Sequence, residues 1–163
     1  MISRKVGMIS LGCPKNQVDG EALLAKLKKA GYEIVNNIED SDVMIVNTCG
    51  FIEQAKKEAI DTILEVAEYK NEGLISAIVV TGCLAERYQD EIIKEMPEVD
   101  AVLGIGANSD IVKTCDKALC GIVTTSFPNK CYLSINDERI ISTPSHWAYL
   151  KIAEGCDNRC SYC

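Results

Sequence analysis

The chain has 163 residues, enough for one well-buried domain and a shorter tail. It is 47% hydrophobic, and its 24 acidic and 17 basic residues give a net charge of −7. That balance argues against direct binding to nucleic acid, because binding to phosphates depends on Lys and Arg. No apolar run is as long as a membrane helix, and the first residues lack the apolar core of a signal peptide. We therefore expect a cytoplasmic protein with no membrane partner.

Apolar strands alternate with amphipathic helices along the first 119 residues. Strands are predicted at 5–11, 32–35, 43–46, 77–81 and 99–103, and helices at 16–30, 52–69, 83–96 and 108–119. Asn16 is predicted to cap the first helix. In the third helix, Leu84, Tyr88, Ile92 and Met96 are predicted to face the core. The alternation predicts an α/β fold with an open, mainly parallel, five-stranded sheet and helices on both faces, like flavodoxin or a Rossmann domain.

After residue 122 the pattern weakens, which indicates a domain boundary. Residues 1–122 form the predicted first domain, and 123–146 a linker with two short candidate strands, Cys131–Ile135 and Arg139–Ser142. Residues 147–163 then begin a second domain, with 147–153 as its first strand. So short a stretch cannot form a domain, so we expect the chain to be an inactive fragment of a longer protein.

Three of the nine cysteines follow predicted strands directly: Cys13, Cys49 and Cys83. One such cysteine is most simply a buried thiol. Three at equivalent ends of parallel strands can converge at one edge of the sheet, where open α/β folds bind ligands. In a reducing compartment, metal binding explains them better than disulfides. By contrast, Cys115 lies on an apolar helix face and is predicted to pack in the core, and Cys120 and Cys131 are predicted to be free thiols.

A second group, Cys156, Cys160 and Cys163, has the spacing C-x3-C-x2-C at the end of the chain. Thiolates so close together select an iron–sulfur cluster, zinc or copper(I). Three thiolates would leave one iron of a four-iron cluster open to a ligand. Zinc would need a fourth ligand, which His146 could supply only if the chain folded back.

Four segments together resemble the methylthiotransferases of the radical S-adenosylmethionine superfamily: 10–16 (Ser-Leu-Gly-Cys-Pro-Lys-Asn), 47–52, 81–87 and 151–163. The resemblance implies two [4Fe-4S] clusters, one on Cys13, Cys49 and Cys83 and one on Cys156, Cys160 and Cys163. It also implies that S-adenosylmethionine binds the second cluster with its adenine near Tyr162. The last residues would then begin a truncated radical S-adenosylmethionine barrel. No residue of the chain is assigned a directly catalytic role.

Two segments are similar to the branch of the family that modifies a ribosomal protein: Pro14-Lys15, after the first cysteine, and the sequence of residues 143–151. The resemblance implies transfer of a methylthio group to an aspartate of the small-subunit ribosomal protein at the decoding centre, with an electron donor such as flavodoxin or ferredoxin. In that chemistry a 5′-deoxyadenosyl radical removes a substrate hydrogen before sulfur is transferred. Two alternatives stay open: a transfer-RNA adenosine methylthiotransferase, and a non-catalytic electron-transfer module that binds an iron–sulfur cluster or zinc.

Overall fold

A computed structural model describes residues 4–128, 138–153, 155 and 157–161. Six strands form one sheet in the order β2-β1-β3-β4-β5-β6, and every neighbouring pair is parallel. The strands are β1 (Lys5–Ser10), β2 (Glu33–Ile34), β3 (Val43–Thr48), β4 (Ala77–Gly82), β5 (Ala101–Leu103) and β6 (Thr124–Ser126). The predicted open parallel sheet is confirmed, with one more strand than expected. The first five strands have the order of flavodoxin-like folds.

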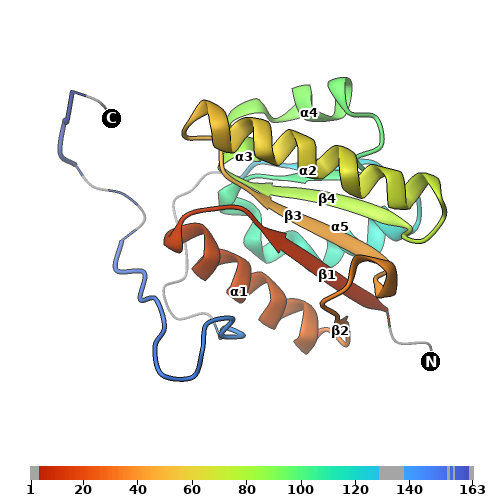
Figure 1. Ribbon diagram of the computed structural model, residues 1–163, viewed down its shortest axis with the longest axis horizontal. Helices are drawn as coiled ribbons and strands as arrows, with labels where there is room; N and C mark the ends of the chain where they lie inside the picture. The colour runs from red at the N-terminus through yellow and green to blue at the C-terminus, as the bar shows by residue number, and fades with distance from the viewer. Residues whose placement is uncertain (1–3, 129–137, 154, 156, 162–163) are drawn as a thin grey trace.

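Helices cover both faces of the sheet, as predicted (Figure 1). Helices α2, α3 and α4 lie on one face, and α1 and α5 lie on the other. The α-helices are α1 (Pro14–Lys29), α2 (Glu53–Asn71), α3 (Cys83–Tyr88), α4 (Asp90–Glu95) and α5 (Ile111–Leu119), and the 3-10 helices are η1 (Ile38–Asp40) and η2 (Ile105–Asp110). No helix in the described parts of the chain is long and apolar enough to cross a bilayer.

Alternate residues of each strand enter opposite cores, because successive side chains of a strand point to opposite faces. In β3, Met44 and Val46 pack under α2, whereas Val43 and Ile45 pack against α1 and α5. All six residues of β3 are buried. Burial on both faces explains why the first four residues of this strand, 43–46, are a continuous apolar run rather than an alternating pattern.

The helix predicted at 83–96 is two helices, and this expectation was wrong. The chain breaks at Gln89, whose φ is +46°, and this left-handed conformation ends α3 before α4 begins. The predicted inward residues are still correct, since Leu84, Ile92 and Met96 are buried and Tyr88 packs against the same core.

Larger differences follow residue 122. Residues Thr124–Ser126, predicted as linker, form β6, because the exposed edge of β5 offers main-chain partners whatever the side chains are. The candidate strands Arg139–Ser142 and 147–153 are not strands. A strand needs a hydrogen-bonded neighbour, and within the part of the chain that the structure describes, no strand of the sheet pairs with these residues. The other candidate, Cys131–Ile135, lies outside the described residues.

Candidate functional site: the carboxyl edge of the sheet

Three neighbouring strands, β1, β3 and β4, end at the same edge of the sheet, and each leads to a predicted site cysteine. The register pairs Ser10 with Asn47, and Thr48 with Gly82, so the strand ends are level. Cys13 is the residue before α1, Cys49 follows β3 directly, and Cys83 is the first residue of α3. The reversal in strand order lies between β1 and β3, and doubly wound folds bind their ligands at such a point.

Two glycines bring the cysteine-bearing loops into direct contact. A Cβ added to Gly50 would lie 3.0 Å from the Leu84 backbone and 3.3 Å from the Cys83 carbonyl carbon. A Cβ added to Gly82 would lie 2.3 Å from the Thr48 carbonyl oxygen. The segments around Cys49 and Cys83 therefore pack backbone against backbone, with no room for intervening side chains.

Asn16 joins the first loop to the other two. Its Nδ2 donates a hydrogen bond to the Thr48 carbonyl at 3.2 Å, and its own carbonyl accepts one from Asn47 Nδ2 at 2.9 Å. Thr48 Oγ1 in turn donates to the Thr81 carbonyl at 2.6 Å. The predicted capping role of Asn16 was wrong: Cys13 occupies the N-cap position, and Asn16 instead braces the sheet edge from inside the first helical turn.

A small polar crevice lies beside this brace, lined by Asn16, Asp19, Leu23, Asn47, Thr81, Gly82, Ile105 and Asn108. Asn16 Oδ1 is buried and has no hydrogen-bond partner among the described residues. Buried acceptors are nearly always paired. The Asn16 side chain thus lines this crevice while its Oδ1 is an acceptor without a partner among the described residues.

The thiols differ in exposure in the way that separates reactive from inert cysteines. Cys13 is exposed, and Cys49 and Cys83 are half-buried. Cys115 is fully buried, as predicted, and burial followed by the nearby Asp116 charge raises its pKa to about 12. Cys120, a predicted free thiol, is exposed.

Soft thiolates are the donors that iron–sulfur clusters prefer, and these three thiols follow strands that end at the same edge of the sheet. The side chains themselves are not gathered: within the described ranges, no three His, Cys, Asp or Glu side chains form a group that could hold a metal ion. Of the second cysteine group only Cys160 is described, and it is exposed; Cys156, Cys163, Tyr162 and the thiol Cys131 lie outside the described residues. The assignment of all six cysteines and of Tyr162 stays a prediction.

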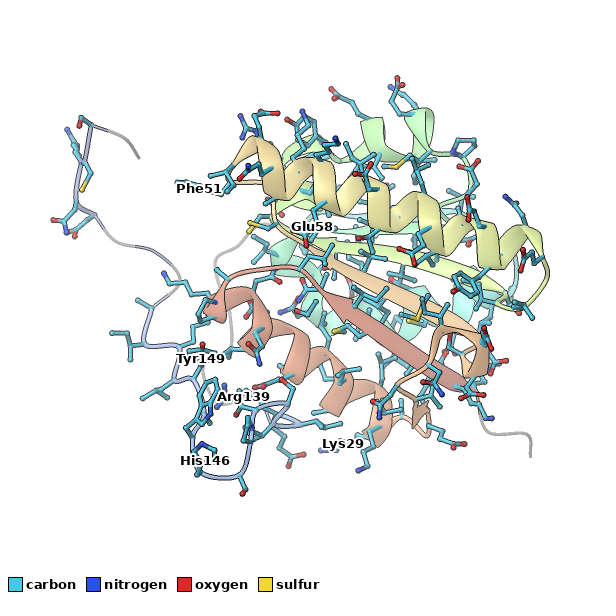
Figure 2. All side chains as sticks on the ribbon, viewed as in Figure 1. Lys29, Phe51, Glu58, Arg139, His146 and Tyr149 are labelled. Carbon is cyan, nitrogen blue, oxygen red and sulfur yellow. The ribbon has the colours of Figure 1, made fainter. Side chains whose placement is uncertain are left out.

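Sequence reasoning missed the polar residues that shape this edge. Asn47 and Thr48 end an otherwise apolar buried strand, and both are at most 2% exposed. Polar side chains inside a buried strand need partners, and that requirement was the available signal. Figure 2 also shows exposed Phe51 near the start of α2, two residues after Cys49. His146 lies on the segment beside α1 in the same view.

Comparison with known proteins defines the family. Residues 5–104 match the family model described as Uncharacterized protein family UPF0004, and the chain belongs to that family. It is 51% identical over 170 aligned residues to the ribosomal protein uS12 methylthiotransferase RimO of Acetivibrio thermocellus, an alignment that covers 99% of this chain and 37% of the relative.

Proteins of the same name from other bacteria are similarly close. The relative from Caldicellulosiruptor saccharolyticus is 52% identical, with 98% of this chain and 37% of the relative covered. The relative from Clostridioides difficile is 48% identical, with 98% and 36% covered. The chain thus spans somewhat more than a third of the length of these relatives.

Proposed function

We propose that this chain is the amino-terminal part of a ribosomal protein uS12 methylthiotransferase. The observation that carries the proposal is the identity of about half of all aligned positions with enzymes of that name, over nearly the whole chain. The parallel strand ends add independent support, since they bring the loops of Cys13, Cys49 and Cys83 into contact. In this proposal an aspartate of uS12 receives the methylthio group. The protein acts in the cytoplasm.

In this proposal Cys13, Cys49 and Cys83 hold one [4Fe-4S] cluster, and Cys156, Cys160 and Cys163 hold another. When bound, such clusters supply one-electron chemistry toward S-adenosylmethionine and an open iron for sulfur. Tyr162 would help to bind the adenine of S-adenosylmethionine. Electrons come from a flavodoxin or ferredoxin, and this chain does not bind nucleic acid directly, in keeping with its net charge of −7.

The described residues position the three cysteine-bearing loops. Asn16 holds the loop of Cys13 against Thr48, which directly precedes Cys49. Gly50 and Gly82 allow the second and third loops to touch. Each cysteine lies at a strand or helix end rather than in a long loop, which limits its movement once it binds metal.

Iron counting tests the proposal. After reconstitution with iron and sulfide, the protein expressed from its complete gene should hold about eight irons, and Cys49→Ala should hold about four. Cys120→Ala is the matched control, because Cys120 is an exposed thiol outside both groups, and it should keep about eight. A Cys49→Ala protein with the full complement would contradict the site at the sheet edge. A colourless protein with stoichiometric zinc would support the non-catalytic module.

The substrate is tested separately. The reconstituted protein, S-adenosylmethionine and a reduced flavodoxin are incubated with uS12 or with transfer RNA, and each product is analysed by mass spectrometry. The proposal predicts a methylthio group on an aspartate of uS12. Modification of an adenosine in transfer RNA, with uS12 unchanged, would instead establish the other branch.

A further inference from the structure

A segment far from α1 in the sequence, residues 138–151, lies along that helix; Arg139 and Tyr149 are labelled beside it in Figure 2. The main contact is Glu21, whose side chain accepts hydrogen bonds from the Ser142 amide at 2.9 Å and the Ser142 hydroxyl at 2.7 Å. Arg139 Nη1 lies 3.6 Å from the other carboxylate oxygen. The Glu21 carbonyl also accepts from the Ile140 amide at 3.1 Å.

Glu21 is an unusual residue to bury. It is only 4% exposed, although it stands on a helix whose other buried side chains include Val18, Ala22 and Leu23. A buried carboxylate is stable only where hydrogen bonds and positive charge replace water. Here the partners come from residues more than a hundred positions later in the chain. The Glu21 carboxylate therefore fixes the position of residues 139–142 along α1.

A second contact lies nearer the carboxyl edge of the sheet. Lys151 Nζ is 2.7 Å and 2.9 Å from the two carboxylate oxygens of Asp19, and the lysine side chain is only 10% exposed. Asp19 also lines the crevice with Asn16, Asn47 and Gly82. The ion pair thus brings residue 151 to the loops of the first cysteine group. Cys156 is five positions after Lys151, and an extended chain of five residues spans at most about 18 Å.

We propose that Glu21 and Asp19 form a docking site for residues 138–151, and that this docking sets the distance between the two cysteine groups. Asp19, Glu21, Arg139 and Lys151 are positioning residues in this view. Docking itself is independent of the proposed function. The rate of a reaction between two bound groups depends steeply on their relative placement. The effect of docking on methylthio transfer between the two cysteine-bound centres therefore rests on the proposed function.

Charge reversal tests the docking in the protein expressed from its complete gene. Lys151→Glu and Asp19→Lys each place like charges together, and the double variant Asp19→Lys/Lys151→Glu restores an opposite pair. Lys29→Glu is the control, because Lys29 is exposed on the same helix (Figure 2). Hydrogen exchange at the Ile140 and Ser142 amides reports docking directly, since both amides donate to Glu21.

Each single reversal should lower the protection of these amides by about tenfold or more, while the double variant returns to within a few-fold of the original protein. Protection in Lys151→Glu equal to that in Lys29→Glu would overturn the docking site. Glu21→Gln is a second test that keeps the packing of the helix: the amide oxygen can still accept from Ser142 but no longer attracts Arg139, so protection should fall less than in Glu21→Ala.

The positional role is decided by activity measured alongside iron content. Lys151→Glu should retain its iron, and the transfer of a methylthio group to uS12 should fall by about 10- to 100-fold and be rescued in the double variant. Full transfer in a variant that has lost amide protection would overturn the positional role. If the original protein shows no transfer at all, the proposed function fails, and the exchange data still decide the docking site.

Discussion

Gly82 is the last residue of β4, and its backbone conformation sets the position of Cys83. Gly82→Ala should therefore disturb the carboxyl edge of the sheet directly. Its φ of +95° and ψ of −162° lie in a region that only glycine occupies readily. A Cβ there would also lie 2.3 Å from the Thr48 carbonyl oxygen and 2.8 Å from the Thr48 amide nitrogen. Both are backbone atoms of the neighbouring strand, so neither can move aside as a flexible side chain would.

The magnitude follows from two costs. A non-glycine residue in such a conformation costs about 1–3 kcal/mol. Forcing an extra carbon into a packed interior costs about 1–3 kcal/mol more. We therefore expect Gly82→Ala to lower the free energy of unfolding by about 2–6 kcal/mol, and to lower the melting temperature by about 2–4 °C for each of these kcal/mol.

Gly73→Ala is the matched control, because Gly73 also has a positive φ, +76°, but a Cβ there would meet nothing within 4 Å. Only the conformational cost of about 1–2 kcal/mol should remain. Urea denaturation followed by circular dichroism measures both variants. If Gly82→Ala destabilised the chain no more than Gly73→Ala does, the close packing of the cysteine-bearing loops would be refuted.

Two further predictions concern stability. Burial, with a smaller contribution from Asp116, raises the pKa of Cys115 from 9.0 to about 12, so the unfolded state loses this proton first as the pH rises. Its contribution to stability should be complete below pH 9 and decline between pH 9 and about 12, and urea denaturation across that range measures the decline. In Cys115→Ala the decline should be smaller but not absent, because burial also raises the pKa of Tyr32. Lys70 Nζ contacts Asp100 at 2.6 Å and the Glu98 carbonyl at 2.8 Å in a partly buried position. Lys70→Met should cost about 1–2 kcal/mol in thermal unfolding; a loss as small as that from Lys57→Met, an exposed site on the same helix, would count against the contact.

Much of the fold could be predicted because apolar runs bounded by turn residues mark buried parallel strands. The break at Gln89 could not, since neither glycine nor proline marks it. Strand β6 also escaped prediction, because Thr124–Ser126 gains its structure from the free edge of β5 and not from its own side chains. The opposite error affected residues 147–153, which contain β-forming side chains but pair with no strand among the described residues.

The candidate site was predictable only in part. The placement of Cys13, Cys49 and Cys83 after parallel strands follows from the sequence pattern, because strand ends of a parallel sheet share an edge. The brace at Asn16 does not, since its bond to the Thr48 carbonyl exists only after two distant segments have packed together. The residues next to Asn16 in the sequence predicted only a helix cap for the same side chain.

The three cysteine-bearing loops come from separate strand–helix units, and this has a consequence for biogenesis. No short peptide of the chain contains the whole edge, because β1 and β4 begin at residues 5 and 77. Parallel pairing between such remote segments forms late and slowly. A nascent chain would therefore have to extend well beyond residue 83 and fold before any ligand that needs all three loops could bind at this edge.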